Sequence, residues 1–184
     1  MRILGIDPGS VATGFGVVER SGDQLLHVAH GTIRPTRGTE MHQRLSVIFG
    51  ELERVIEQYA PEHAVIEKVF VAASAKSALV LGQARGVALA ALGRAALPVQ
   101  ELAAREIKKA VAGTGSATKE QVQVMVAELL ALDARPESDA ADALAGAICA
   151  LNANRLAAVG YTNRRRRRPS SRRSRLDLRT GRTS

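Results

Sequence analysis

The chain opens with Arg2-Ile3-Leu4-Gly5-Ile6-Asp7-Pro8-Gly9-Ser10, an apolar run that ends in a carboxylate and a turn signal. A short apolar run with such a boundary is typical of a buried strand, and proline followed by glycine favours a change of direction. Asp7 is therefore predicted to lie just past a strand end, with backbone on one side and open space on the other.

Three further acids have comparable settings. Glu67 ends the apolar run Ala64-Val65-Ile66, and Asp139 and Asp142 lie one helical turn apart, so that they face the same side of a helix. Converging carboxylates repel one another unless a cation neutralises them, and hard cations such as Mg²⁺ prefer oxygen ligands. The four acids are therefore predicted to form a metal site.

Some of these acids also have an ordinary structural explanation. Asp7 can open a turn at Pro8, and Asp139 can cap a helix and favour its dipole. Glu67 has fewer such explanations, because glutamate is not a favoured turn residue. Capping does not exclude metal binding, so both interpretations of Asp139 stay open.

The order of the predicted elements indicates the fold class. Strands alternate with turns at first, and strands then alternate with amphipathic helices, which favours an α/β domain: a mixed five-stranded sheet with helices on both faces. The predicted strands are 3–7, 13–19, 24–33, a fourth ending at residue 67, and 98–101, and the predicted helices are 41–59, 75–95, 103–112, 119–132 and 139–156.

The charge is unevenly distributed. The 184 residues carry a formal net charge of +8, yet residues 164–184 alone hold ten Arg and one Asp, so that residues 1–163 are close to neutral. We therefore expect a folded domain over 1–157 and a basic tail over 158–184. The tail has no apolar face to bury and is expected to be disordered when free.

Other features limit the cellular setting. Cys149 is the only cysteine, which excludes an intramolecular disulfide and favours a small core residue. No signal peptide is recognisable, and no stretch reaches the roughly 20 apolar residues of a membrane helix. The sequence predicts a cytoplasmic protein without a membrane partner.

Five segments together carry a family resemblance. They are Ile6-Asp7-Pro8-Gly9-Ser10, Ile66-Glu67-Lys68-Val69-Phe70, Leu81-Gly82-Gln83-Ala84-Arg85-Gly86, residues 113–122, and Asp139-Ala140-Ala141-Asp142-Ala143-Leu144. In this order and spacing they resemble the RuvC family of Holliday-junction resolvases over about residues 1–157. The resemblance implies the RNase H-like fold. Ser74 stands where asparagine is frequent in that family, and Thr118 where an acid is common.

The resemblance implies an activity as well: a structure-specific endonuclease that resolves Holliday junctions by paired symmetric nicks, in recombination and repair. Two Mg²⁺ ions in each active site, with Mn²⁺ as an alternative, would support phosphodiester hydrolysis. The implied metal ligands and catalytic residues are Asp7, Glu67, Asp139 and Asp142, with Asp7 bridging. Lys119 joins them to stabilise charge on the phosphate, although it can also be a solvated first-turn lysine.

The resemblance also implies DNA contacts and partners. The DNA-binding candidates are Phe70, Arg85, Lys108, Lys109 and Lys119, together with Arg164, Arg165 and Arg166 of the tail. Phe70 would stack on a base, although it can also be a core residue. The small residues of the helix at 79–93 would form a homodimer interface or pack on the sheet. The implied partners are a four-way DNA junction and the RuvA–RuvB branch-migration complex, at the nucleoid.

Two other classes of protein share parts of this pattern. The Gly-Ile-Asp-Pro-Gly-Ser opening also resembles the first phosphate motif of sugar kinases and actin-like ATPases, but those need a duplicated domain that this chain is too short to contain. A non-catalytic junction-binding protein is the second alternative. Such a protein would have no reason to keep all four acids.

Overall fold

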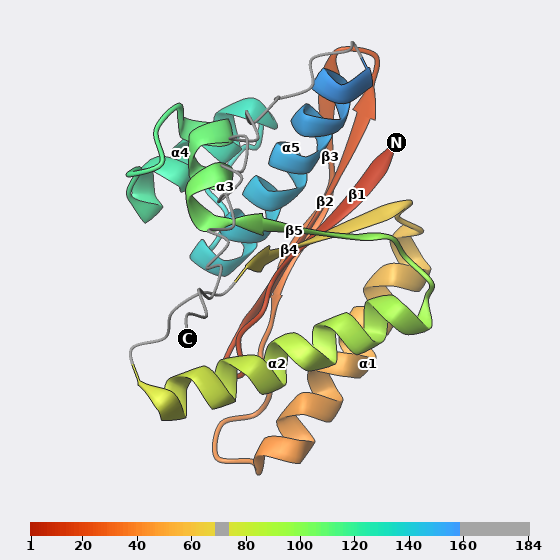
Figure 1. Cartoon of the computed structure of the whole chain (residues 1–184), viewed down its shortest axis with the longest axis vertical. Helices are drawn as coiled ribbons and strands as arrows, with labels where there is room; N and C mark the ends of the chain where they lie inside the picture. Colours follow the sequence, from red (N-terminus) through yellow and green to blue (C-terminus); the bar gives the residue numbers. More distant parts are fainter. Residues whose placement is uncertain (69–73, 159–184) are drawn as a thin grey trace, which may run out of the picture.

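The computed structural model describes residues 1–68 and 74–158 of the chain. The elements follow in the order β1 (Arg2–Asp7), β2 (Thr13–Ser21), β3 (Gln24–Ile33), α1 (Met41–Tyr59), β4 (His63–Lys68), α2 (Ala75–Arg94), β5 (Val99–Ala103), α3 (Ala104–Ala112), α4 (Lys119–Leu129) and α5 (Ser138–Ala158) (Figure 1).

The five strands form one mixed sheet in the order β3-β2-β1-β4-β5. The first three strands are an antiparallel meander, whereas β1, β4 and β5 run parallel to one another. This is the predicted mixed sheet. β1 is its central strand and β4 lies beside it, and these are the strands that end near Asp7 and Glu67.

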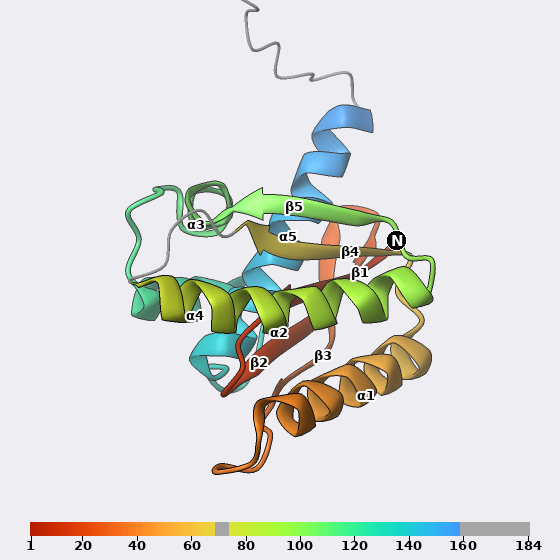
Figure 2. The same cartoon turned by 60° about the horizontal axis from the view of Figure 1, so that its bottom comes forward.

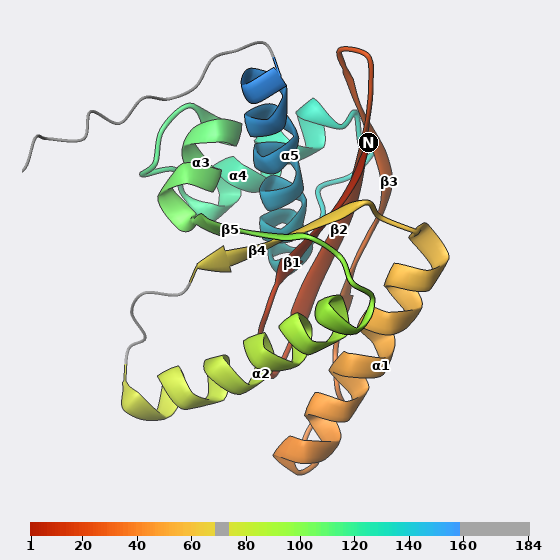
Figure 3. The ribbon, with the colours of Figure 1, turned by 45° about the vertical axis from the view of Figure 1, so that its right-hand side comes forward.

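Helices cover both faces of the sheet, as predicted. Figures 1 and 3 show α3, α4 and α5 on one face and α1 and α2 on the other, and α1 and α2 pack against each other (Figure 2). Each face has its own core: Ile3, Val18 and Val65 are buried beneath α5, and Leu4, Val17 and Ile66 are buried beneath α1 and α2. This alternation follows the two-residue period of a strand.

The helix α5 lies unusually close to β1 and β2. A side chain at Gly5 would overlap the backbone of Ala143, and one at Gly14 would overlap the backbone of Asp139. Glycine at these two positions therefore allows α5 to rest directly on the strands. The close approach brings the start of α5, with its two acids, over the end of β1.

Gly5→Ala is expected to destabilise the protein by about 1–3 kcal/mol, because the added methyl group would push α5 away from β1. Urea unfolding monitored by circular dichroism measures this loss. Gly50→Ala is a suitable control, since nothing lies near a side chain added there. Equal unfolding midpoints for the Gly5→Ala and Gly50→Ala proteins would contradict the close packing of α5.

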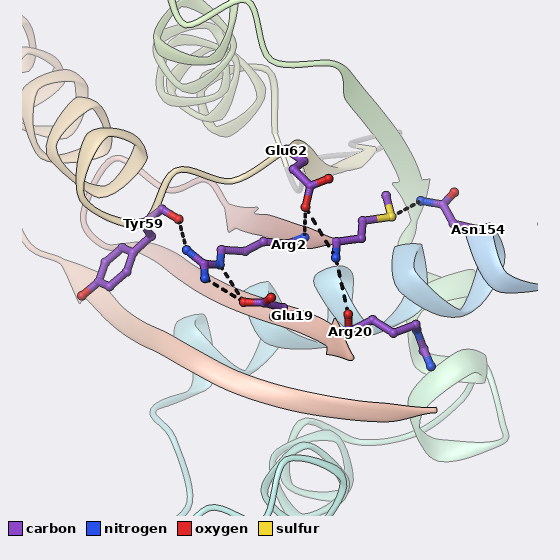
Figure 4. Close-up of polar contacts among 7 residues, drawn as sticks. Arg2, Glu19, Arg20, Tyr59, Glu62 and Asn154 are labelled. Carbon is purple, nitrogen blue, oxygen red and sulfur yellow. Dashed lines mark hydrogen bonds and ion pairs between the residues drawn. The ribbon is translucent and has the colours of Figure 1, made fainter. Parts of the chain in front are cut away.

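A polar cluster fixes the start of β1, at the end opposite Asp7 (Figure 4). The Arg2 guanidinium donates to Glu19 Oε2 at 2.7 Å and to the Tyr59 carbonyl at 2.6 Å, and the Arg2 backbone N–H donates to Glu62 Oε1 at 2.8 Å. These contacts tie β1 to β2 and to the connection between α1 and β4. They support the register in which Ile6 lies opposite Ile66.

Several element boundaries differ from the predicted ones. α4 ends at Leu129 rather than at residue 132, because Ala131 adopts a left-handed conformation with φ 49°. β5 extends to Ala103.

Cys149 is buried and unpaired, as predicted, and burial, with Glu106 nearby, raises the pKa of its thiol to about 11. None of the helices in the described residues is long and apolar enough to cross a membrane.

Candidate active site

Three elements bring the predicted acids together. β1 and β4 are parallel neighbours in which Ile6 is paired with Ile66, so Asp7 and Glu67 emerge at the same edge of the sheet. Asp7 is paired with Gly14 on β2, and the Asp139 backbone lies directly over Gly14. The start of α5 is therefore held beside the end of β1.

Three of the four acids share one cleft of about 270 Å³. Its lining residues are Asp7, Glu67, Ala104, Ile107, Lys108, Lys119, Val122 and Asp142. Asp139 instead borders a second pocket of about 540 Å³, beside Ser10 and Lys76. The structure thus brings all four acids to one region: Asp139 lies outside the cleft that the lysines line, yet it is near enough for its charge to raise the pKa of Asp7.

The ionisation of Asp7 reflects this crowding. Burial, followed by the charges of Asp142, Glu67 and Asp139, raises the pKa of the Asp7 carboxyl to about 7, against a smaller lowering by Lys119. The ordinary value is 3.8. A buried carboxylate among like charges favours the neutral form, so Asp7 is the group whose charge most requires a cation.

Glu67 and Asp142 are affected in the same direction. Burial and the charge of Asp142 raise the pKa of Glu67, against the lysines Lys108 and Lys119. Burial also raises the pKa of Asp142, although Lys119 Nζ lies 3.7 Å from Asp142 Oδ2. That ion pair is partly exposed, so solvent weakens the lysine's effect and burial prevails.

The two lysines of the cleft have different restraints. Lys108 Nζ donates to the Ala117 carbonyl at 2.8 Å, which holds the ammonium at the cleft wall. Lys119 lies in the first turn of α4, as predicted, and is largely exposed apart from its contacts with Asp142 and Ser138. Sequence reasoning treated Lys108 and Lys109 alike, but Lys109 is exposed and does not line the cleft.

The donor set suits a divalent cation. Within residues 1–68 and 74–158, no three acidic, His or Cys side chains already surround one point at ligand distances, so the carboxylates must adjust to bind a shared ion. Their chemistry nevertheless fits a hard cation, because all are oxygen donors. Burial and, after it, repulsion by the other acids raise the pKa of Asp7, and a bound cation would stabilise its charged form.

The turn after Asp7 is braced by residues that sequence reasoning missed. Thr13 Oγ1 donates to the Gly9 carbonyl at 2.7 Å, and the Arg44 guanidinium of α1 donates to the Ser10 carbonyl. Thr13 and Ser10 are both buried. This network fixes the direction in which the chain leaves Asp7. The threonine, four residues from Gly9, was a local signal, whereas Arg44 had none.

The remaining candidates are placed as follows. Arg85 on α2 is mostly buried and contacts Glu67 and Glu101. Ser74 caps α2 by accepting from the Ser77 N–H at 3.1 Å, and Thr118 caps α4 in the same way. Asp139 lies inside the first turn of α5. Phe70 and the tail arginines Arg164, Arg165 and Arg166 lie outside the described residues.

A mixed sheet with acids at two adjacent parallel strand ends and on a helix packed across them defines a nuclease of the RNase H-like class. The profile of the family described as "Crossover junction endodeoxyribonuclease RuvC" matches residues 3–150. The chain belongs to this RuvC family, as its motifs predicted.

Individual relatives agree with this assignment. The protein named "Crossover junction endodeoxyribonuclease RuvC" from Cupriavidus metallidurans is 53% identical over 152 residues, covering 83% of this chain and 84% of the relative. Its namesake from Acinetobacter baumannii is 50% identical over 178 residues, covering 93% and 98%. The solved structure "T. thermophilus RuvC in complex with Holliday junction substrate" has a TM-score of 0.80 at 31% identity, covering 85% of this chain and 96% of that one.

Proposed function

We propose that this chain resolves Holliday junctions by paired, symmetric nicks that depend on Mg²⁺. The observation that carries the proposal is the single cleft in which Asp7, Glu67 and Asp142 meet Lys108 and Lys119. Carboxylates and ammonium groups side by side suit a phosphodiester that is held together with its metal ions. The T. thermophilus relative is described in complex with a Holliday junction substrate, which supports the choice of DNA substrate.

The acids and the lysines of the site would have different roles. Asp7, Glu67, Asp139 and Asp142 would hold two Mg²⁺ ions. Bound divalent ions supply an activated water and neutralise charge on the phosphate and leaving oxygen. Lys119 has few restraints on its exposed side chain and would stabilise the negative charge that develops on the phosphate. Lys108 is anchored at the Ala117 carbonyl and would hold the strand in place.

A homodimer would match the two-fold symmetry of a four-way junction. On α2, Ala84, Ala88 and Leu92 face the core, so the packing interpretation of its small residues holds for that face. On the other side, Leu79 is 66% exposed and Gly82 has open space around it. This outer face is the proposed dimer surface. The RuvA–RuvB complex and the nucleoid in the cytoplasm remain the expected partner and location.

The direct test is incubation of the full-length protein with synthetic four-way junctions, with and without Mg²⁺, followed by mapping of the nicks on each strand. The expected result is a pair of nicks at symmetric positions that requires Mg²⁺. Tight junction binding without nicks would instead indicate the non-catalytic binding protein. Nicks on a linear duplex at the same rate would remove the specificity for junctions.

Removing residues 164–184, the arginine-rich part of the basic tail, is expected to weaken junction binding and to flatten its salt dependence. The tail carries ten arginines beside a nearly neutral body, and each phosphate that it neutralises adds about 0.9 to the slope of log K against log salt. Binding isotherms at several salt concentrations measure the slope. Nick positions should not change, because phosphate contacts carry little sequence information.

Substitutions within the tail separate charge from other effects. Replacing Arg164–Arg168 by lysine keeps the charge and should preserve the slope, whereas replacement by glutamine should lower it. Equal slopes for the truncated and complete proteins would show that the tail does not contact DNA.

A further inference from the structure

Arg85 on α2 does not line the cleft, and its two contacts are with residues of β4 and β5. Its Nε donates to the backbone carbonyl of Glu67 at 3.3 Å, and its Nη2 pairs with Glu101 Oε2 on β5. The Arg85 side chain is only 20% exposed. One guanidinium thus joins a helix, the end of β4 and the neighbouring strand β5.

Arg85 contacts Glu67 at the point where β4 is no longer paired with β1. β4 is paired with β1 only as far as Ile66, so Glu67 lies one residue beyond its last partner on β1. On its other side, Glu67 is still paired with Leu102 of β5. Arg85 therefore supplies a restraint at a strand end that has only one neighbouring strand.

A contact between Arg85 and DNA is not favoured by this geometry. A phosphate would have to draw the guanidinium away from both Glu101 and the Glu67 carbonyl, and Glu101 already balances its charge. The planar, forked guanidinium suits two fixed acceptors at once. This position is the one expected of a residue that orients a metal-ligating side chain without binding the metal itself.

We propose that Arg85 is a positioning residue, which fixes the carbonyl of Glu67 so that the Glu67 carboxylate faces Asp7 across the cleft. This assignment rests on the proposed function, because Glu67 is taken there to be a metal ligand. It replaces a DNA contact by a structural action on the active site, and the two roles differ in what they change.

Arg85→Gln removes the positive charge and the forked pair of donors, and is the main test. We expect its single-turnover cleavage rate at saturating junction to fall about 10- to 100-fold, with a higher half-saturating Mg²⁺ concentration, as for partners that orient metal ligands. Junction affinity in chelator, and its salt slope, should stay at the wild-type values. Glu101 is 45% exposed, so water can solvate it and the variant should fold.

Two further variants sharpen the result. Arg85→Lys keeps the charge but has one nitrogen for two acceptors, so its rate should be intermediate. Glu101→Gln loosens Arg85 and should lower the rate in the same direction. If Arg85 contacted DNA instead, Glu101→Gln would free it and tighten junction binding. The matched control is Arg94→Gln, which breaks the Arg94–Glu53 pair elsewhere on α2 and should leave rate and Mg²⁺ requirement unchanged.

A second readout does not need cleavage. Calorimetric titration of the DNA-free proteins with Mn²⁺ should show weaker binding for Arg85→Gln, by about 10-fold or more, and unchanged binding for Arg94→Gln. The proposed function fails if the wild-type protein makes no nicks, and this titration still tests Arg85. Wild-type cleavage and Mn²⁺ affinity in Arg85→Gln, or a loss of junction affinity with a flatter salt slope, would overturn the assignment.

Discussion

Asp7→Asn is expected to lower the rate of junction cleavage by about a thousand-fold or more while junction binding is retained. The substitution keeps the shape of the side chain but removes a charge from the centre of the acid cluster. Loss of metal-based charge stabilisation worth about 4 kcal/mol corresponds to a factor of this size. Single-turnover kinetics with a labelled junction give the rate, and gel-shift titration gives the affinity.

The other acids provide internal comparisons. Glu67→Gln and Asp139→Asn should behave in the same way, and Asp133→Asn, an exposed site remote from the cleft, should cut normally. Binding by the Asp7→Asn protein should be equal to or tighter than that of the wild type, because a negative charge near the phosphate is gone. Near wild-type nicking by any one of the three variants would show that its residue is not a metal ligand.

In chelator at pH 8, Asp7→Asn is expected to stabilise the protein by about 4 kcal/mol, since each unit of pKa shift corresponds to 1.36 kcal/mol. The folded-state pKa of Asp7 is raised from 3.8 to about 7, so the folded protein favours the protonated carboxyl. The contribution of this carboxyl to the free energy of unfolding is fully present below pH 4 and is lost as the pH rises through 7. Asparagine does not ionise, so the variant does not lose this stability as the pH rises.

Thermal unfolding between pH 4 and pH 8 measures this difference. At pH 8 the variant should melt about 10 °C above the wild type, and the gap should narrow steadily as the pH falls towards 4. Added Mg²⁺ should raise the melting temperature of the wild type more than that of the variant, because ligand binding stabilises the folded state. A gap independent of pH would contradict the raised pKa of Asp7.

Local sequence patterns predicted the elements that carry the acids. Asp7 and Glu67 could be placed because each follows a short apolar run, and a parallel pair of strands then brings their ends together. The spacing of Asp139 and Asp142 gave their common helix face. These features depend on the periodicity of a single segment and on its turn signals, which are visible without tertiary contacts.

The residues that hold the site in place could not be predicted from local sequence patterns. Arg44 is 34 positions from the Ser10 group that it holds, and Arg85 reaches Glu67 only because α2 packs beside the end of β4. Nothing in the local pattern distinguishes these arginines from solvated ones. Lys108 and Lys109 are adjacent in sequence, yet only Lys108 lines the cleft, because the rotation of α3 decides which of the two faces inward.

The packing of α5 couples the stability of the active site to the stability of the whole fold. This helix lies between the sheet and the helices α3 and α4, with Ala143, Leu144 and Ile148 nearly inaccessible to solvent, and glycines on β1 and β2 leave no gap beneath it. Local openings of a native protein begin in weakly packed segments. We therefore expect the buried turns of α5 that follow Asp139 and Asp142 to be among the most slowly exchanging parts of the protein. Moving the two acids away from Asp7 would require movement of this packed helix.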